Sequence, residues 1–474
     1  MGTFQKINTI GSALLLASLL FLLPSANVAA DQRPNVLMIW VDDLRPEITT
    51  FGAEGMKTPG IDQLARQSIT FDRAYCNIPV CGASRASVMT GLRGTPDRFV
   101  DYTARADEDA PDAVALHELF HNNGYNTAFY GKVFHNAEDS AEAWDQTKHF
   151  KHWPGYIGEE AIQQLKEQRK KNRNGPPWEA PDVEDTETWD GKIAAATEKA
   201  IKQLATKDKP FFIATGFLKP HLPFVAPKKY WDLYPTDEIT LPQNLTTRPN
   251  APGIAFTKWE EMRKYAGMPQ SGPIDPEDAQ KVIAGYRACV SFIDAQIAHV
   301  LDSLEASGVA DNTIIVLLGD HGWNLGEHGM WAKHCCFETS MRTPLMISAP
   351  MLEEFKAGKS TKALTEFVDI YPTLCELAGL ETPKDLEGES AVSVLIDPSA
   401  SHRDFAIGRF HKGDTIRTDR FRYTIFHEGT GEEIGQMLYD HSIDPAEDHN
   451  LAKEQQWQST VRQLRRQLAD VTGQ

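Results

Sequence analysis

Three near-continuous apolar segments predict buried β-strands. They lie at 35–41 (NVLMIWV), 210–217 (PFFIATGF) and 313–318 (TIIVLL). Apolar runs of this length without alternation are typical of strands buried on both faces of a parallel sheet. The first run ends in Asp42-Asp43, the second leads into Lys219-Pro220-His221, and the third ends in Gly319-Asp320-His321-Gly322. Open α/β sheets place their binding sites at the carboxyl ends of the strands, so these polar residues mark the predicted functional edge.

Helical segments separate these strands and predict a doubly wound α/β fold. The segments lie at 60–68, 190–205, 277–306 and 366–379. Strands that alternate with helices in this way are typical of a mostly parallel sheet with helices on its faces. The charged, Pro-rich stretch at 168–189 interrupts the pattern, and we interpret it as a surface insertion.

A change of pattern near residue 395 predicts a second, smaller unit. Small and polar residues fill 390–403, and 405–440 then has the pattern of short strands with a Gly-rich turn, EGTGEE. We therefore expect a main domain at 31–395 and a C-terminal α+β subdomain at 396–474 with an antiparallel sheet. Two units also fit the length of 474 residues, because single cores stop growing at roughly 250–300 residues.

The net charge of the chain argues against a nucleic-acid partner. The formal net charge is −18, whereas proteins that bind nucleic acid need concentrated Lys and Arg to replace counterions. We therefore expect no nucleic-acid partner. An anionic ligand would have to meet a local basic pocket.

The first thirty residues predict a signal peptide (1–30). Lys6 supplies the positive start, 13–23 (ALLLASLLFLL) is a short apolar run, and Val28-Ala29-Ala30 offers small residues for cleavage. The alternative is a membrane anchor, but the apolar run is shorter than the ~20 residues that a spanning helix needs. We therefore expect a periplasmic or secreted protein whose mature chain begins near Asp31 and has no transmembrane anchor.

The six cysteines do not predict a disulfide framework. They stand at 76, 81, 289, 335, 336 and 375. A chain of this size does not need such a framework, and the spacing lacks the paired C-x-x-C of a structural metal site. The sequence leaves open any pairing among Cys76, Cys289, Cys335, Cys336 and Cys375.

The carboxylates at the strand ends suit a hard metal ion. Asp42, Asp43 and Asp320 offer the oxygen ligands that Ca²⁺ prefers, whereas no Cys-rich or triple-His set indicates zinc. A lone Asp-Asp pair after a strand is more often a solvated loop, so the neighbouring motifs decide between the two interpretations.

The most informative stretch is CGASRASVMTG at 81–91. By itself a cysteine near an arginine is a weak signal, and a buried structural cysteine is the usual alternative. This stretch resembles the signature of the formylglycine-dependent (type I) sulfatase family, in which the cysteine is oxidised after translation to formylglycine. The one departure is Ala83, where most members carry proline, and it bears on which maturation enzyme acts on the chain.

The resemblance extends along the whole chain. Further blocks follow in family order: RPNVLMIWVDD (33–43), TPGIDQLA (58–65), GKVFH (131–135), FLKPHLPF (217–224), GDHGWNLGEHGMWAKH (319–334), VDIYPTLCELAGL (368–380) and LYDHSIDPAEDHNLA (438–452). Together they are similar to the iduronate-2-sulfatase branch. That branch implies an alkaline-phosphatase-like α/β/α sandwich with a large mostly parallel sheet. The implied activity is hydrolysis of O-sulfate esters on an acidic, uronic-acid-containing polysaccharide or oligosaccharide.

The resemblance also implies a set of site residues. The ligands of a Ca²⁺ ion would be Asp42, Asp43, Asp320, His321 and the oxygen of residue 81, with His321 where many sulfatases have Asn. Cys81, as hydrated formylglycine, would attack sulfur with one hydroxyl and expel sulfate with the other. Arg85 would hold this diol, Lys132 and His135 would anchor diol and sulfate with His135 as the base, and His221 and Lys333 would protonate the leaving alkoxide.

Three alternatives remain at this point. The bacterial-looking export signal favours algal polysaccharides such as ulvan as a second substrate class. A phosphodiester or phosphonate hydrolase could use the same formylglycine. A glycan-binding relative without activity is the third, although every catalytic position is filled.

A uronic acid would need a further cation, because Arg85, Lys132 and Lys333 are assigned to the sulfate. Candidates are Arg98 and a basic cluster in the C-terminal part, namely Arg409, His411, Lys412 and Arg417. Solvated surface charges are the alternative interpretation of these residues.

Overall fold

The computed structural model describes residues 1–2, 33–149, 155–246, 250–257 and 261–473. The predicted signal peptide falls, apart from its first two residues, outside these ranges. None of the helices within them combines the length and the apolar character that crossing a bilayer requires.

A large, mostly parallel sheet forms the centre of the molecule, as predicted. Its strand order is β11 (Lys359–Thr361), β2 (Ile69–Phe71), β10 (Leu345–Ser348), β9 (Thr313–Gly319), β1 (Asn35–Val41), β7 (Phe211–Phe217), β4 (Asn126–Gly131) and β5 (Gln146–Lys148). Only β10 runs antiparallel to its neighbours. The three strands that the sequence predicts, β9, β1 and β7, lie side by side in the middle of the sheet.

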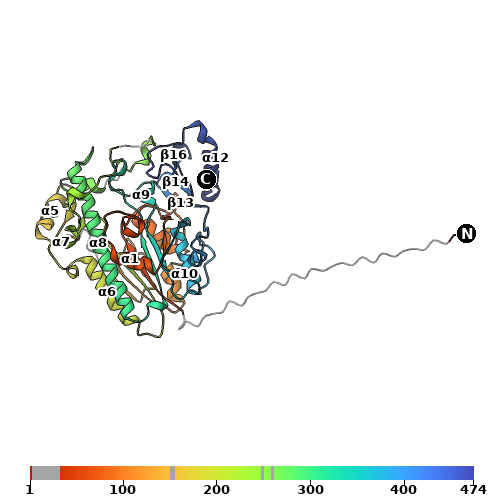
Figure 1. The fold of residues 1–474 in the computed structure, drawn as a ribbon, viewed down its shortest axis with the longest axis horizontal. Coiled ribbons are helices and arrows are strands. Elements are labelled where there is room, and N and C mark those ends of the chain that lie inside the picture. Colours follow the sequence, from red (N-terminus) through yellow and green to blue (C-terminus); the bar gives the residue numbers. More distant parts are fainter. Residues whose placement is uncertain (3–32, 150–154, 247–249, 258–260, 474) are drawn as a thin grey trace.

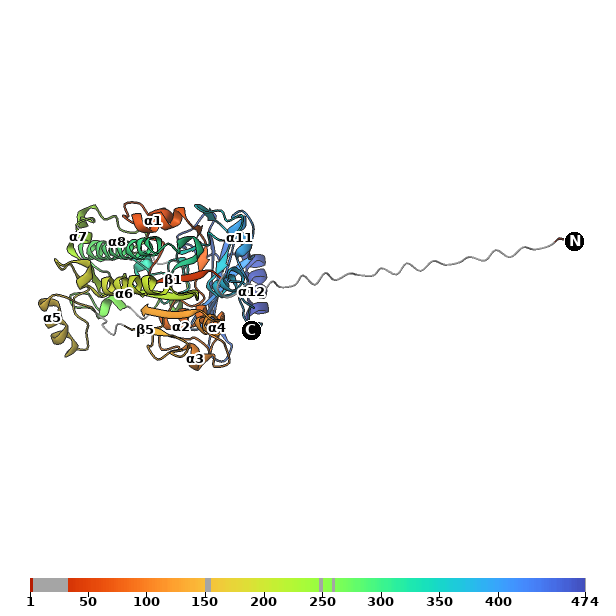
Figure 2. The ribbon, with the colours of Figure 1, turned by 90° about the horizontal axis from the view of Figure 1, so that it is seen from below.

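Helices cover both faces of this sheet (Figure 2). One face carries α1 (Pro59–Arg66), α6 (Trp189–Leu204) and α8 (Pro276–Ala306), and the other carries α2 (Cys81–Thr90), α4 (Leu116–Asn122) and α10 (Ile370–Leu377). Leu37, Ile39 and Val41 of β1 enter the first core, whereas Val36, Met38 and Trp40 enter the second. Because neighbouring side chains of a strand point to opposite faces, two apolar cores explain the continuous apolar run.

The C-terminal part carries the predicted antiparallel sheet. Strands β13 (Phe405–Phe410), β14 (Gly413–Thr418), β15 (Phe421–His427) and β16 (Glu433–Asp440) pair in chain order, and α12 (Gln458–Thr472) packs on them (Figure 1). Ion pairs join this sheet to the main domain: Glu338 accepts from Arg417 at 3.3 Å and from Arg422 at 2.5 Å. Arg417 therefore helps to hold the C-terminal sheet against the main domain.

Shorter elements complete the chain. They are β3 (Ala74–Tyr75), α3 (Ala106–Asp109), α5 (Glu159–Arg169), β6 (Trp178–Glu179), α7 (Lys228–Trp231), β8 (Phe224–Val225), α9 (Glu338–Met341), β12 (Thr365–Glu366) and α11 (Val392–Ile396). There are also 3₁₀ turns, of which η6 (Glu261–Lys264) matters below.

The stretch at 168–189 has a structural role that the interpretation as a surface insertion misses. Its strand β6 pairs in parallel with β8, which follows the His221 loop. Arg173 donates to the carbonyl oxygens of Arg263 at 3.3 Å and Met268 at 2.9 Å. This stretch therefore supports the turn η6.

The carboxyl ends of β4 and β7 approach each other so closely that only glycine fits. A Cβ atom on Gly216 would lie 1.9 Å from the carbonyl oxygen of Lys132, and one on Gly131 would lie 2.1 Å from that of Gly216. These contacts are with backbone atoms, which cannot turn aside as a flexible side chain can. The close approach fixes the backbone from which Lys132 projects.

We therefore expect Gly216→Ala to destabilise the fold. Separating the two backbones should lower the free energy of unfolding by about 1–3 kcal/mol. The urea midpoint of the purified variant measures this. Gly253→Ala is the matched control, because a Cβ there meets nothing within 4 Å. A Gly216→Ala protein as stable as its parent would contradict the account of this contact.

Candidate active site

The ends of two paired strands bring the predicted carboxylates together. β1 and β9 are parallel neighbours with Val41 opposite Gly319, so Asp42 and Asp320 leave the sheet side by side. The backbone N–H of Asp43 donates to Asp320 Oδ1 at 3.0 Å. Asp43 has a left-handed backbone with φ 64°. This turn allows two consecutive carboxylates, which would point to opposite sides of an extended strand, to enter one cluster.

The cluster has the spacing of a metal site. Ligand atoms of Asp42, Asp43, Cys81 and His321 all lie within 4.8 Å of one another. His321 Nε2 lies 3.2 Å from Cys81 Sγ, 3.6 Å from Asp43 Oδ1 and 3.7 Å from Asp320 Oδ1. Adjacent ligands of an octahedral ion with bonds of 2.3–2.6 Å are separated by about 3.3–3.7 Å. The structure thus brings every predicted metal ligand to one place.

The protonation of the cluster also suits a divalent cation. Burial, together with the charges of Cys81 and Asp42, raises the pKa of Asp43 well above its usual value although Lys333 opposes this. Burial would lower the pKa of His321, but Asp320 and Cys81 raise it to about 9. Asp43 and His321 therefore both favour their protonated forms, and a divalent cation could replace these protons.

Arg85 lies beneath the carboxylates and not in the cavity. Its side chain is fully buried on α2, with Nε 2.9 Å from Asp320 Oδ2 and a terminal nitrogen 3.3 Å from Asp42 Oδ1. The other terminal nitrogen donates to the carbonyl oxygens of Lys132 and Val133. Because these partners occupy the guanidinium, it holds the two acids in place.

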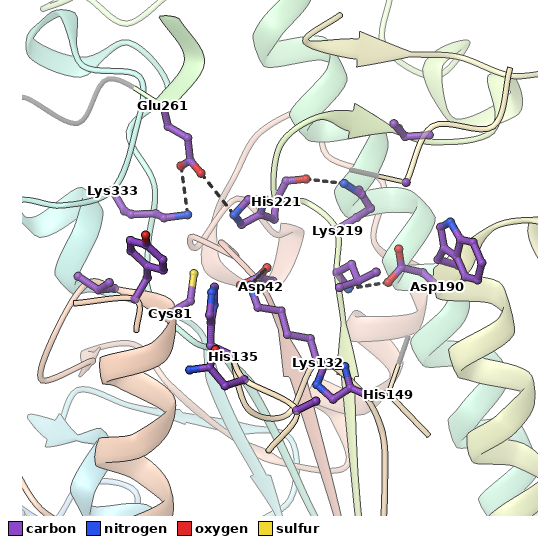
Figure 3. Close-up of a pocket in the computed structure, with 18 of the residues that line it drawn as sticks. Asp42, Cys81, Lys132, His135, His149, Asp190, Lys219, His221, Glu261 and Lys333 are labelled. Atoms are coloured by element: carbon purple, nitrogen blue, oxygen red, sulfur yellow. Dashed lines mark hydrogen bonds and ion pairs between the residues drawn. The ribbon is translucent and has the colours of Figure 1, made fainter. Parts of the chain in front are cut away.

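Two lysines connect the carboxylates to an open cavity of about 710 Å³ (Figure 3). Lys132 Nζ lies 2.6 Å from Asp42 Oδ2, and Lys333 Nζ lies 2.9 Å from Asp43 Oδ1. Both line the cavity beside Cys81, which begins helix α2. Two ammonium groups and a helix N-terminus favour an anion at this point.

Two histidines lie on different sides of the cavity. Burial and the charge of Lys132 lower the pKa of His135 to about 3, so the ring is neutral and can accept a proton. Its Nδ1 has no hydrogen-bond partner within the described ranges. His221 Nδ1 lies 2.7 Å from the carbonyl oxygen of Leu222, and burial and Lys333 lower its pKa to about 3.

Several residues that line the cavity were not predicted. They are Tyr102, Lys219, Glu261, Lys264 and His334. Lys219 is buried and donates to the carbonyl oxygens of His221 at 2.6 Å and Pro223 at 2.7 Å, so it secures the loop that carries His221. Its place beside His221 in Lys219-Pro220-His221 was a signal for this role. Glu261 and Lys264 come from a charged segment without any motif.

The predicted basic cluster does not belong to this cavity. Arg98 pairs with Glu387 at 2.9 Å, Arg409 with Asp414 at 3.6 Å, Arg417 with Glu338 at 3.3 Å, and Lys412 with Glu428. Neither these four residues nor His411 lines the cavity around Cys81. The structure therefore does not support them as the partners of a second anionic group beside the sulfate.

All six cysteines are buried and form no disulfide bonds. Burial raises the pKa of the thiols of Cys76, Cys289 and Cys336. Among the six, Cys81 is the one that lines the cavity.

Comparison with known proteins gives consistent matches. The family model "Sulfatase" matches residues 34–380, and the model "N-sulphoglucosamine sulphohydrolase, C-terminal" matches 326–474. A sulfatase of Formosa agariphila is 34% identical over 91% of this chain and 86% of its own. The iduronate 2-sulfatase of Mus musculus is 30% identical over 96% and 97%.

A solved structure supports the fold. The phosphonate monoester hydrolase of Silicibacter pomeroyi matches with a TM-score of 0.77 and 21% identity, over 92% of this chain and 95% of its own. At this identity the likeness concerns the fold alone, and it agrees with the predicted large sheet and smaller C-terminal sheet.

We expect Asp320→Ala to lose the metal ion. Asp320 meets Arg85, the backbone of Asp43 and the edge of His321, so its removal both deletes a ligand and disorders two others. Metal analysis after gel filtration measures the bound divalent cation. Asp294→Asn is the control, because Asp294 is a buried carboxylate that binds the start of α1 instead. Unchanged metal content in Asp320→Ala would refute the ligand assignment.

Proposed function

Because the chain belongs to the sulfatase family and is a sulfuric ester hydrolase, we propose that it removes O-sulfate groups from an acidic sugar chain, with Cys81 converted to formylglycine. The observation that supports this most directly is the position of Cys81, which is at once a neighbour of the metal cluster and part of the cavity wall. The iduronate 2-sulfatase match favours a 2-O-sulfated uronic acid as the substrate unit.

Ca²⁺ is the proposed metal. Carboxylate oxygens dominate the cluster, and a hard cation prefers such ligands. Bound there, the ion would withdraw electron density from the sulfuryl group and offset the repulsion between anionic ester and nucleophile. Asp42, Asp43, Asp320, His321 and the oxygen of residue 81 would hold it.

The residues around the cavity divide the remaining work. Hydrated formylglycine would supply one hydroxyl for attack on sulfur and a second for release of sulfate. Lys132 and Lys333 bind the terminal sulfate oxygens, while Arg85 keeps the metal carboxylates in place. His135 is neutral, no group of the described ranges bonds its Nδ1, and it accepts a proton on one side. His221 and Lys333 face the leaving oxygen on the other side and return a proton to it.

The charge of the site favours a monoanionic ester. Asp42, Asp43, Asp320 and Glu261 provide four negative charges, and Arg85, Lys132 and Lys333 provide three positive ones. With a divalent cation bound, Asp43 would be ionised and His321 neutral, so these groups and the cation would together carry one net positive charge. A sulfate monoester carries a single negative charge and neutralises the site, whereas a phosphate monoester dianion would leave it negative.

Lys264 is the proposed partner of a substrate carboxylate. It lines the cavity and is exposed, and no acidic group within the described ranges pairs with it. Lys132 and Lys333 have carboxylate partners, and Lys219 is bound to carbonyl oxygens. Among the lysines of the described ranges that line the cavity, Lys264 is therefore the cation available to a uronic acid, in place of Arg98 and the C-terminal basic cluster.

The place of action is also part of the proposal. The pattern of residues 1–30 indicates export, so we propose a periplasmic or secreted enzyme that meets sulfated polysaccharide outside the cytoplasm. A maturation enzyme that accepts Ala83 would convert Cys81. Ulvan oligosaccharides belong in the substrate screen beside sulfated iduronate.

We predict that the active protein carries formylglycine at position 81. Mass spectrometry of the tryptic peptide should show an aldehyde oxygen in place of the thiol, and Cys81→Ala should be inactive. Cys375→Ala, which changes a buried cysteine of α10 outside the cavity, should retain activity. Full activity from protein with an unmodified Cys81 thiol would exclude this nucleophile.

We predict that Lys264→Ala discriminates between substrates. Its kcat/KM should fall roughly tenfold on a sulfated uronic acid, the effect of one charge-assisted hydrogen bond. Nitrophenyl sulfate has no carboxylate and should be affected little. Lys199→Ala, an exposed lysine of α6 outside the cavity, should change neither rate. Equal losses on both substrates would show that Lys264 does not recognise the sugar.

A further inference from the structure

Glu261 is an unexpected carboxylate in a cavity that must receive an anion. It begins the turn η6, and its side chain points down into the cavity toward Lys333 and His221 (Figure 3). One oxygen lies 3.1 Å from Lys333 Nζ and the other lies 3.4 Å from His221 Nε2. A carboxylate near a sulfate ester costs binding energy, so its position requires a compensating role.

The two partners of Glu261 are the residues assigned to the leaving oxygen. Lys333 also contacts Asp43, and His221 also contacts the carbonyl oxygen of Leu222. Glu261 is therefore the direct link between two side chains that come from distant parts of the sequence. The opposite side of the cavity, with Lys132 and His135, has no such contact with it.

The contacts of His221 show what Glu261 does. Nδ1 faces a carbonyl oxygen at 2.7 Å and Nε2 faces a carboxylate oxygen at 3.4 Å. Two acceptors on opposite sides fix the plane of the ring, and the charge of Glu261 opposes the lowering of the His221 pKa by burial and Lys333. A hydrogen on Nε2 is what a group that protonates a leaving oxygen needs.

A second metal site does not explain this arrangement. Ligand atoms of Asp43, His221 and Glu261 do lie within 4.8 Å of one another. However, the ammonium of Lys333 lies between two of them, 2.9 Å from Asp43 and 3.1 Å from Glu261. A cation is thus already present, and a divalent ion would have to displace it against its charge.

We propose that Glu261 is a positioning residue for the leaving-group side of the reaction. Its carboxylate holds the Lys333 ammonium and the Nε2 edge of His221 where both can meet the ester oxygen. This inference rests on the proposed sulfatase function. It assigns Glu261 no contact with the metal and no contact with the sulfate.

The test compares two sulfate esters that differ in their need for a proton. A sugar sulfate leaves as a basic alkoxide and depends on protonation, whereas nitrophenyl sulfate leaves as a stable anion. Glu261→Gln keeps the size of the side chain and removes its charge. It should lower kcat/KM on the sugar sulfate roughly 10- to 100-fold and on nitrophenyl sulfate by less than about threefold. Its bound metal should equal that of the parent.

Two further variants make the result specific. Glu261→Asp keeps the charge but withdraws it by one methylene, so it should show the same selective loss. Glu198→Gln is the matched control, since Glu198 also pairs with one lysine and one histidine, Lys202 and His299, and has a similar exposed fraction, 26% against 22%. It lies on α6 outside the cavity and should leave both rates unchanged.

Each other outcome overturns the inference. Equal losses on both esters would mean a general structural role, and parental rates from Glu261→Asp would mean that charge alone matters. Loss of one bound metal ion in Glu261→Gln would mean that Glu261 is a ligand. If the parent enzyme releases sulfate from neither ester, the proposed function itself fails, and that result is distinct from all of these.

Discussion

Three buried carboxylates at the ends of two parallel strands set the requirements for the rest of this structure. Asp42, Asp43 and Asp320 are at most 1% exposed, and isolated charges at such depth are very costly. Arg85, Lys132 and Lys333 compensate them from below and from the sides. Because Lys333 also pairs with Glu261, these cations are shared among four acids, and the same constraint favours a divalent cation at the carboxylates and an anion in the cavity.

The fold supplies the rigidity that this arrangement needs. The carboxylates extend from the central strands of a sheet with apolar cores on both faces, and Arg85 extends from a helix whose residues are all buried. The close contact of Gly131 with Gly216 fixes the backbone before Lys132. Segments outside the sheet, namely the loop of His221 and the turn of Glu261, then complete the cavity. The residues proposed as acid and as base therefore lie on different segments of the chain around one rigid group of charges.

Much of the fold and of the candidate site could be predicted from the sequence, because the signals lie in short local stretches. Strands buried on both faces leave continuous apolar runs, so β1, β7 and β9 and the acids that follow β1 and β9 were predictable. Motif resemblance identified Cys81, Lys132 and His221, because their neighbours recur as blocks. The position of Arg85 beneath the carboxylates was not predictable, since it depends on how α2 crosses the sheet.

The residues that the sequence misplaced or missed also have physical explanations. Arg98 and Arg417 were candidates for binding substrate because basic residues stood out in an acidic chain, yet ion pairs with Glu387 and Glu338 fix them elsewhere. Glu261 lies in a charged run that has the pattern of a solvated surface. Only the long-range contacts of the turn η6, which Arg173 supports, bring it to the cavity. The boundary at 395 and the signal peptide remain predictions.

The comparison of sulfate with phosphorus esters tests the central claim most directly. Metal-replete protein with converted Cys81 would be assayed with the nitrophenyl esters of sulfate, phosphate and phenylphosphonate, which share one leaving group. The charge balance of the site predicts a higher kcat/KM for the two monoanionic esters, sulfate and phenylphosphonate, than for the dianionic phosphate. The proposed sulfatase function predicts the highest value for the sulfate. A higher kcat/KM for the phosphonate would contradict the account and would indicate a phosphonate monoester hydrolase on the same charge centre.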